Sequence, residues 1–100
     1  MLFISVVNVN HLPSNSYEYI GRGSVLGNPY IIGKHGNREQ VIALYKRLLW
    51  QQIKSLGPMG LEVMRLAACI LPITLGCHCK PLPCHGDVVR AAIHWVRSQA

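Results

Sequence analysis

The sequence predicts an α/β fold: a small, largely parallel sheet of about three strands with three helices packed on it. A run rich in β-branched residues opens the chain at residues 2–9, and residues 73–79 alternate apolar with polar or small residues at the period of a strand. Between them, apolar residues recur at the three- and four-residue spacing of helices. We therefore expect the two strands to be joined by a helical crossover and to lie side by side and parallel.

The composition indicates one globular domain over residues 1–100. Half of the residues are hydrophobic and 14% are charged, which excludes a disordered chain, and 100 residues are too few for two independent cores. Charged residues interrupt every apolar run before it reaches the roughly 20 residues that cross a bilayer. Because the first ten residues also lack a basic leader and a cleavage site, we expect a cytoplasmic protein that does not bind membranes.

The first two strands are expected at residues 2–9 and 17–20. Both faces of the first run are mostly apolar, which favours a central strand. The second run is short and leads directly into Gly21 and Gly23, which end it.

The strongest helical pattern follows Asn37, a good N-cap residue, and ends at Gly57 and Pro58. A shorter helix is expected over residues 60–69, with Cys69 packed in the core. A last helix reaches toward Gln99 after the prolines that end the strand at 73–79.

Residues 21–36 form a candidate binding loop, because they hold five glycines and a proline. Glycine lets backbone amides approach a ligand closely, and Arg22 can grip a phosphate or carboxylate through two parallel hydrogen bonds. Gly27 and Asn28 belong to the same candidate site. The segment matches neither a Walker A sequence nor a dinucleotide fingerprint, so it names no ligand.

A second candidate segment, residues 77–87, is rich in cysteine and histidine. Thiolates and imidazoles are the preferred ligands of zinc, and a tetrahedral site needs four of them. The ligands of structural zinc sites usually come in pairs two to four residues apart, whereas here one pair is separated by a single residue and the other is adjacent. His78, His11 or His35 is therefore an alternative fourth ligand. The predicted metal ligands are Cys77, Cys79, Cys84 and His85.

The same segment supports other interpretations. Cys84 stands at the mouth of the last helix and is followed by Gly86, and a helix start lowers a thiol's pKa and favours a bound anion. Asp87 is expected to cap the helix or to present a carboxylate to a ligand. A catalytic cysteine with His85 as base lacks a third orienting group, and a packing role for the cysteines stays open.

The net charge of +6 attracts nucleic acid and other anions, but it also simply keeps a protein in solution. Arg90, His94 and Arg97 share one face of the last helix. A solvated face is the simpler interpretation, since no aromatic platform is visible beside it.

Three sequence motifs carry a resemblance to a known family: Tyr-Ile-Gly-Arg, Leu-Gly-Asn-Pro and Leu-Gly-Cys-His-Cys-Lys-Pro-Leu-Pro-Cys-His-Gly-Asp-Val-Val. The chain resembles domain of unknown function family 4326, found in bacteria and their phages, from about Val6 to the last helix. The resemblance implies no activity, but it implies that the two segments form one site. The residues that match the family pattern are Gly21, Arg22, Gly27, Asn28, Pro29, Tyr45, Cys77, Cys79, Pro81, Cys84, His85, Gly86 and Asp87.

Two functions are therefore expected as alternatives. The first is a domain that binds a small polar or nucleotide-like ligand, with or without catalysis, through Arg22, Gly27, Asn28, Cys84, Gly86 and Asp87. The second is a zinc-stabilised module that binds nucleic acid or a protein.

Overall fold

Two five-residue strands, β1 (Ile4–Asn8) and β3 (Ile73–Cys77), form the parallel pair that the sequence predicts. The computed structural model describes residues 3–13, 15–69, 72–78, 80 and 82–99. In the register of the pair Ile4 lies beside Ile73 and Asn8 beside Cys77. Because parallel strands in register end together, the carboxyl ends of β1 and β3 meet at one edge of the sheet.

The strand order is β1-β3-β2, so β1 is an edge strand and the prediction that it is central is wrong. A two-residue strand, β2 (Glu18–Tyr19), pairs in parallel with the other side of β3. Within β1 only Ile4 is fully buried, whereas β3 is buried at every residue but one. The alternation of residue types in β3 is typical of a strand with one exposed face, but in the structure that face is covered at Gly76. A Cβ at Gly76 would lie 2.5 Å from Val9 and 2.4 Å from Tyr17.

Helix α1 (Arg38–Ser55) is the long helix that the apolar spacing predicts. It begins with a capping box, in which the side chains of Asn37 and Gln40 each accept a hydrogen bond from the other residue's backbone N–H. It ends at Leu56, whose backbone is left-handed with φ of 56°. Its buried side chains form one stripe: Val41, Tyr45, Leu49 and Ile53.

Helix α2 (Pro58–Ala67) begins two residues before the predicted start at Gly60. Proline is well tolerated at the first helical position, where its missing N–H has no intrahelical partner to lose. A Cβ at Gly60 would lie 2.3 Å from the Gln52 carbonyl oxygen, so this glycine lets α2 turn tightly against α1. Cys69, just beyond the helix, is partly buried against the core, as predicted.

Helix α3 (His85–Ser98) is the predicted last helix, with Cys84 at its N-cap. Two of the basic side chains expected as a solvated stripe hold this helix in place instead. The Arg90 guanidinium donates to the Ile4 carbonyl at 2.7 Å, which ties α3 to β1. The Arg97 guanidinium donates to the carbonyls of Ala67 and Cys69 at 3.2 and 3.1 Å.

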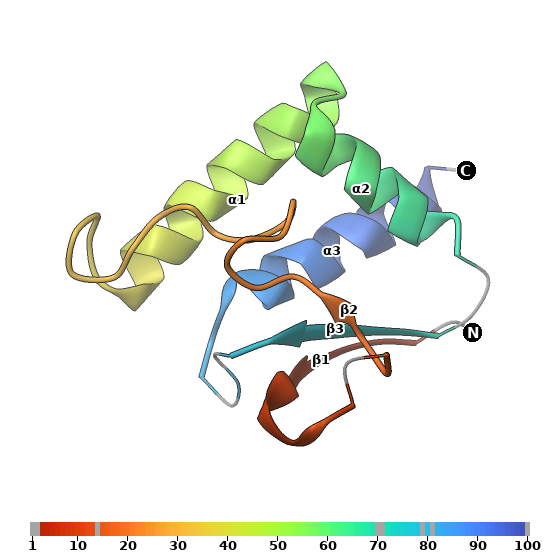
Figure 1. Cartoon of the computed structure of the whole chain (residues 1–100). Coiled ribbons are helices and arrows are strands. Elements are labelled where there is room, and N and C mark those ends of the chain that lie inside the picture. Colours follow the sequence, from red (N-terminus) through yellow and green to blue (C-terminus); the bar gives the residue numbers. More distant parts are fainter. Residues whose placement is uncertain (1–2, 14, 70–71, 79, 81, 100) are drawn as a thin grey trace.

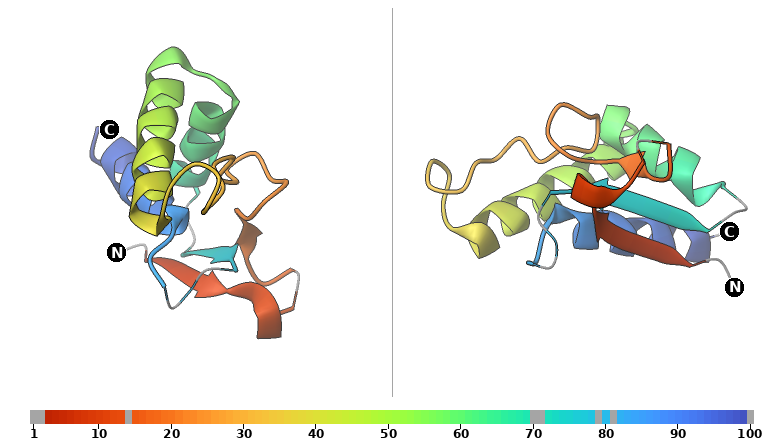
Figure 2. Two further views of the ribbon diagram at one scale, coloured as in Figure 1. Left: turned by 90° about the vertical axis from the view of Figure 1, so that its left-hand side faces the viewer. Right: turned by 60° about the horizontal axis from the view of Figure 1, so that its bottom comes forward.

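The three helices cover one side of the sheet, which confirms the predicted α/β fold (Figure 1). Helix α3 packs directly on β1 and β3, while α1 and α2 pack on α3 and on each other (Figure 2). The strand ends and the starts of α1 and α3 lie on the same side of the molecule, so that edge collects loops and helix N-termini (Figure 1). Among the described helices, none is both long and apolar enough to traverse a membrane. That residues 1–100 make one domain stays a prediction.

Candidate functional site

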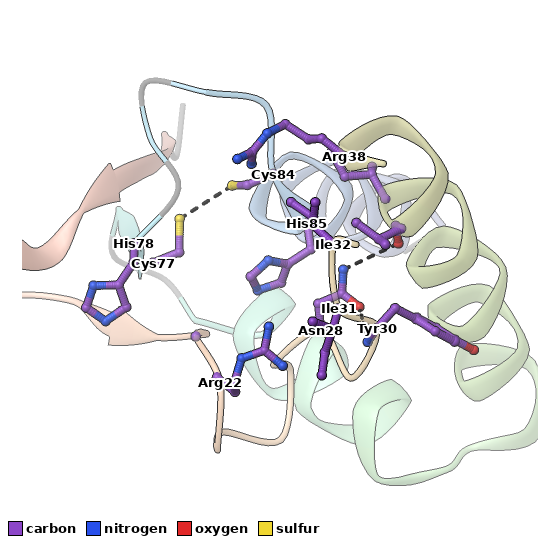
Figure 3. Close-up of a pocket in the computed structure, with 13 residues that line it drawn as sticks. Arg22, Asn28, Tyr30, Ile31, Ile32, Arg38, Cys77, His78, Cys84 and His85 are labelled. Carbon is purple, nitrogen blue, oxygen red and sulfur yellow. Dashed lines mark hydrogen bonds between the residues drawn. The ribbon is translucent and has the colours of Figure 1, made fainter. Parts of the chain in front are cut away.

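A pocket of about 300 Å³ opens beyond the carboxyl ends of β2 and β3, beside the first turns of α1 and α3. Open parallel sheets bind ligands at this edge, outside the carboxyl ends of their strands. Both segments singled out in the sequence contribute to its wall, together with the start of α1 (Figure 3). The lining residues are Gly21, Arg22, Asn28, Tyr30, Ile31, Ile32, Arg38, Val41, Ile42, Cys77, His78, Cys84 and His85.

Consecutive tight turns shape the loop after β2. The Ser24 N–H donates to the Gly21 carbonyl at 3.1 Å, and the Gly27 N–H donates to the Ser24 carbonyl at 3.0 Å. A Cβ at Gly27 would lie 2.5 Å from the Gly21 carbonyl oxygen, so a side chain there would push the turns apart. Gly27 thus shapes the loop without lining the pocket.

The Asn28 side chain fixes this loop to α1. Its carbonyl oxygen accepts from the Tyr30 N–H at 2.9 Å, and its amide nitrogen donates to the Val41 carbonyl at 3.4 Å (Figure 3). Asn28 lines the pocket, but these bonds use both ends of its amide. Its first role in the structure is to position Tyr30 and the apolar residues that follow.

Two arginines enter the pocket wall from different elements. Arg22 comes from the loop after β2 and points toward the His85 ring, whereas Arg38 comes from the first turn of α1 on the opposite side of the view (Figure 3). The Arg38 guanidinium also donates to the Pro83 carbonyl at 3.1 Å, which holds the residue just before the α3 N-cap. No carboxylate belongs to the described lining, so the charged groups of this wall are positive.

His85, the first residue of α3, connects the cysteine-histidine segment to the loop after β2 by a buried contact. It is buried, and its Nε2 lies 2.6 Å from the carbonyl oxygen of Ile20, the residue between β2 and the glycine loop. Its ring meets the Tyr45 ring edge to face, with centroids 5.0 Å apart. The Tyr45 hydroxyl in turn donates to the buried Leu26 carbonyl at 2.7 Å.

Tyr45 is a structural group rather than an acid or base for pocket chemistry. Burial, and secondarily the electrostatic influence of the nearby Cys84, raise the pKa of its phenol above the ordinary value of 10.0. The phenol therefore keeps its proton at neutral pH and serves as a hydrogen-bond donor.

Cys77 at the end of β3 and Cys84 at the start of α3 bring their sulfur atoms to 3.4 Å from each other (Figure 3). Both are buried, with exposed fractions of 1% and 2%, and both border the pocket. The distance exceeds the about 2.05 Å of a disulfide bond. Of the predicted zinc ligands, Cys79 lies outside the described residues, and the described residues contain no group of three or more potential ligands. Zinc binding by Cys77, Cys79, Cys84 and His85 stays a prediction.

Asp87 and Gly86 lie behind the pocket rather than in its lining. The Asp87 carboxylate accepts from the Cys84 N–H at 3.2 Å and from Lys80 Nζ at 2.6 Å, so it caps α3, one of the two roles expected for it. Partial burial raises the pKa of Asp87, but the hydrogen bonds from Lys80 and Cys84 outweigh it and leave the pKa below its ordinary value of 3.8. A Cβ at Gly86 would lie 2.6 Å from Val6, so Gly86 lets α3 approach β1.

The structure thus brings together most, but not all, of the expected ligand-binding residues. Arg22, Asn28 and Cys84 line the pocket, whereas Gly27, Gly86 and Asp87 support it from outside. Six further residues complete the wall. Tyr30, Ile31 and Ile32 fall within the predicted binding loop at residues 21–36, whereas Arg38, Val41 and Ile42 of α1 were not predicted as site residues. The chemistry of Arg38 does not distinguish it from other helix cations, and its one signal is its position at the start of the helix that directly follows the glycine-rich loop.

Most of the chain matches one known protein family. Residues 7–95 match a family described as a domain of unknown function, DUF4326. A protein of Enterobacteria phage T4, described as an uncharacterised 12.4 kDa protein in the nrdA-td intergenic region, is 39% identical over 83 residues, which cover 81% of this chain and 70% of that protein. No solved structure gives a significant match.

Proposed function

Because the chain belongs to the DUF4326 family, whose description names no activity, we propose a function from the pocket itself: it binds a small, negatively charged, nucleotide-like molecule. The observation that carries the proposal is the pair of arginines, Arg22 and Arg38, in one pocket whose described lining holds no carboxylate. A guanidinium binds phosphate or carboxylate through paired hydrogen bonds, and two of them favour a group with more than one negative charge.

The remaining wall is suited to the uncharged part of such a ligand. Ile31 and Ile32 are about half exposed at the rim, and Val41 and Ile42 come from the first turns of α1. Small-molecule sites combine mostly apolar walls with a few polar groups that fix orientation, and about 300 Å³ lies at the lower end of their size range. A base or sugar ring against these side chains, with its phosphate at the arginines, satisfies both parts of the wall.

Thermal stabilisation by defined ligands tests the proposal. Nucleoside monophosphates, sugar phosphates and inorganic phosphate are each added to the purified protein while its Tm is measured. A ligand at ten times its Kd adds about 1.4 kcal/mol to the free energy of unfolding, which raises Tm by several degrees in a chain of this size. A nucleotide that raises Tm more than phosphate alone supports the full proposal.

Arg22→Ala is the decisive variant. The Tyr19 hydroxyl bonds to the backbone carbonyl of Arg22, not to its side chain, so the loop keeps that contact in the variant. We expect Arg22→Ala to fold normally and to lose the ligand-dependent rise in Tm. Lys34→Ala is the matched control, because Lys34 is an exposed cation outside the pocket lining. Equal ligand stabilisation of the wild type and Arg22→Ala would place the binding site elsewhere.

The alternative function is a zinc-stabilised interaction module, and one distance favours it. Two thiolates about 2.3 Å from one tetrahedral zinc are ~3.8 Å apart, which is near the 3.4 Å between the sulfurs of Cys77 and Cys84. Metal analysis of the purified protein decides the matter: about one equivalent of zinc, lost in Cys77→Ser and Cys84→Ser, supports the module. Less than about one-tenth of an equivalent removes its support.

A further inference from the structure

Two tryptophans meet on the surface away from the pocket. Trp50 of α1 and Trp95 of α3 contact edge to face, with ring centroids 5.2 Å apart and planes at 89°, on helices that lie side by side (Figure 2). Trp95 is 47% exposed, although it belongs to a residue type that proteins usually bury well. The contact fixes the ring of Trp95 while leaving about half of it open to solvent.

Cationic and polar side chains of α1 lie beside Trp50, one of the two rings. A shallow hollow beside Trp50 is lined by residues one turn before and one turn after it on α1. We call the tryptophan surface the set Arg47, Trp50, Gln51, Lys54, Ser55 and Trp95.

The charge around the tryptophan surface is uniformly positive. The acids of α1 and α3, Glu39 and Asp87, are both in the first turns, at the pocket end of those helices. The two remaining acids of the chain, Glu18 and Glu62, form ion pairs with Arg65. Ion pairs among the described residues use Arg65 and Lys80 only, so neither Arg47 nor Lys54 is neutralised in this way.

We propose that the tryptophan surface binds single-stranded nucleic acid, with bases stacked on Trp95 and phosphates held by Arg47 and Lys54. Surfaces that bind single strands combine cations along the backbone path with aromatic rings on which unpaired bases stack. Attraction of an acidic protein partner needs only the two cations, whereas a single strand also makes use of the exposed indole. The proposal concerns a different face from the pocket and does not depend on the pocket's ligand.

Fluorescence provides a direct test, because the chain's two tryptophans are both in the surface. Binding of ten-residue oligothymidylate or oligouridylate should quench tryptophan emission saturably, and anisotropy of a labelled strand gives the Kd. With two phosphate contacts, log K should fall with log salt at a slope of about −1.4. Saturable binding of either the DNA or the RNA strand supports the proposal, and the tighter one identifies the preferred chemistry.

Substitutions separate stacking from charge. Trp95→Ala should weaken binding about five- to 150-fold, whereas Trp95→Phe, which keeps a ring, should retain most of it. The double variant Arg47→Glu with Lys54→Glu changes only exposed side chains, so it should fold and weaken binding more than tenfold. Lys34→Glu, in the turn before the start of α1, is the charge control and should stay within about twofold of wild type.

Three results would overturn the proposal. The first is no saturable binding to either strand at low salt. The second is an equal loss, per charge reversed, in Lys34→Glu and in the double variant, because binding would then follow net charge. The third is binding of polyglutamate as tight as that of the oligonucleotides and unaffected by Trp95→Ala, which would indicate an acidic protein partner.

Discussion

His85 Nε2 lies 2.6 Å from the carbonyl oxygen of Ile20, and this single bond joins the start of α3 to the end of β2 across 65 positions of the sequence. The bond is buried and connects the cysteine-histidine segment to the glycine-rich loop. It therefore fixes the distance between the two walls of the pocket.

His85→Ala should destabilise the fold by about 1–3 kcal/mol or more, because it leaves the Ile20 carbonyl without this partner and removes the packing against Tyr45. Urea denaturation measures the loss. His94→Ala is the control: His94 is an exposed histidine of the same helix, and its change should stay within about 0.5 kcal/mol. Equal stability of the two variants would show that the His85 bond contributes nothing.

Tyr45→Phe should cost about 1–3 kcal/mol at pH 7, because the Leu26 carbonyl is buried and loses its donor. The difference should also depend on pH. Since burial raises the folded-state pKa of Tyr45 above 10.0, its contribution is complete below pH 10 and is lost as the pH rises through the folded-state value. The gap between wild type and Tyr45→Phe should thus narrow above pH 10 by up to about 1.4 kcal/mol per pH unit. A gap that is constant from pH 7 to 11 would contradict the raised pKa.

Asp87→Asn should lower stability at pH 6 by less than about 1 kcal/mol, because the carboxylate is 48% exposed and its pairing with Lys80 is screened by solvent. The folded-state pKa of Asp87 lies below 3.8, so its contribution is present above that pH and disappears as the pH falls through the folded-state value. Denaturation curves of the two proteins should differ at pH 6 and approach each other as the pH falls below 3.8. Glu39→Gln removes the same charge from the first turn of α1 and controls for net charge. Curves that differ more at pH 3 than at pH 6 would reverse the predicted sign.

Gly86→Ala should destabilise by about 1–3 kcal/mol, even though alanine is a better helix former than glycine, because its Cβ would lie 2.6 Å from Val6. Val6 belongs to the neighbouring strand and is only half buried, so it offers a test by compensation. The variant that combines Gly86→Ala with Val6→Ala should be more stable than the sum of the two single changes predicts, by about 0.5–3 kcal/mol. Additive changes would show that the contact with Val6 is not the cause.

Much of the fold follows from local chemistry that the sequence displays. Asn37 begins α1, Gly57 and Pro58 mark the corner to α2, and β-branched residues form β1, because caps, prolines and strand preferences act between near neighbours. The position of β1 in the sheet was predicted wrongly. Burial of β3 depends on Tyr17, a residue nearly sixty positions away that covers Gly76.

The lining of the pocket could likewise be predicted only in part, because it depends on contacts between residues distant in the sequence. Arg22 and Cys84 were predicted because unusual residues gather around them, but Arg38 looks like any other cation of an amphipathic helix. Its place in the wall follows from where the start of α1 is held, and the Asn28 bond to Val41 sets that position. Asp87 was expected either to cap α3 or to contact a ligand. Its carboxylate caps the helix by accepting from the Cys84 N–H, and it also accepts a hydrogen bond from Lys80.

The pocket is lined by three parts of the chain, within residues 21–32, within residues 38–42, and at residues 77–78 with 84–85, none of which encloses it alone. A molecule bound there would consequently stabilise the whole fold. It would slow hydrogen exchange at every amide that exchanges only after global unfolding, including amides far from the pocket. Peptides cut from any one stretch should have no affinity for that molecule, so recognition here belongs to the assembled tertiary structure.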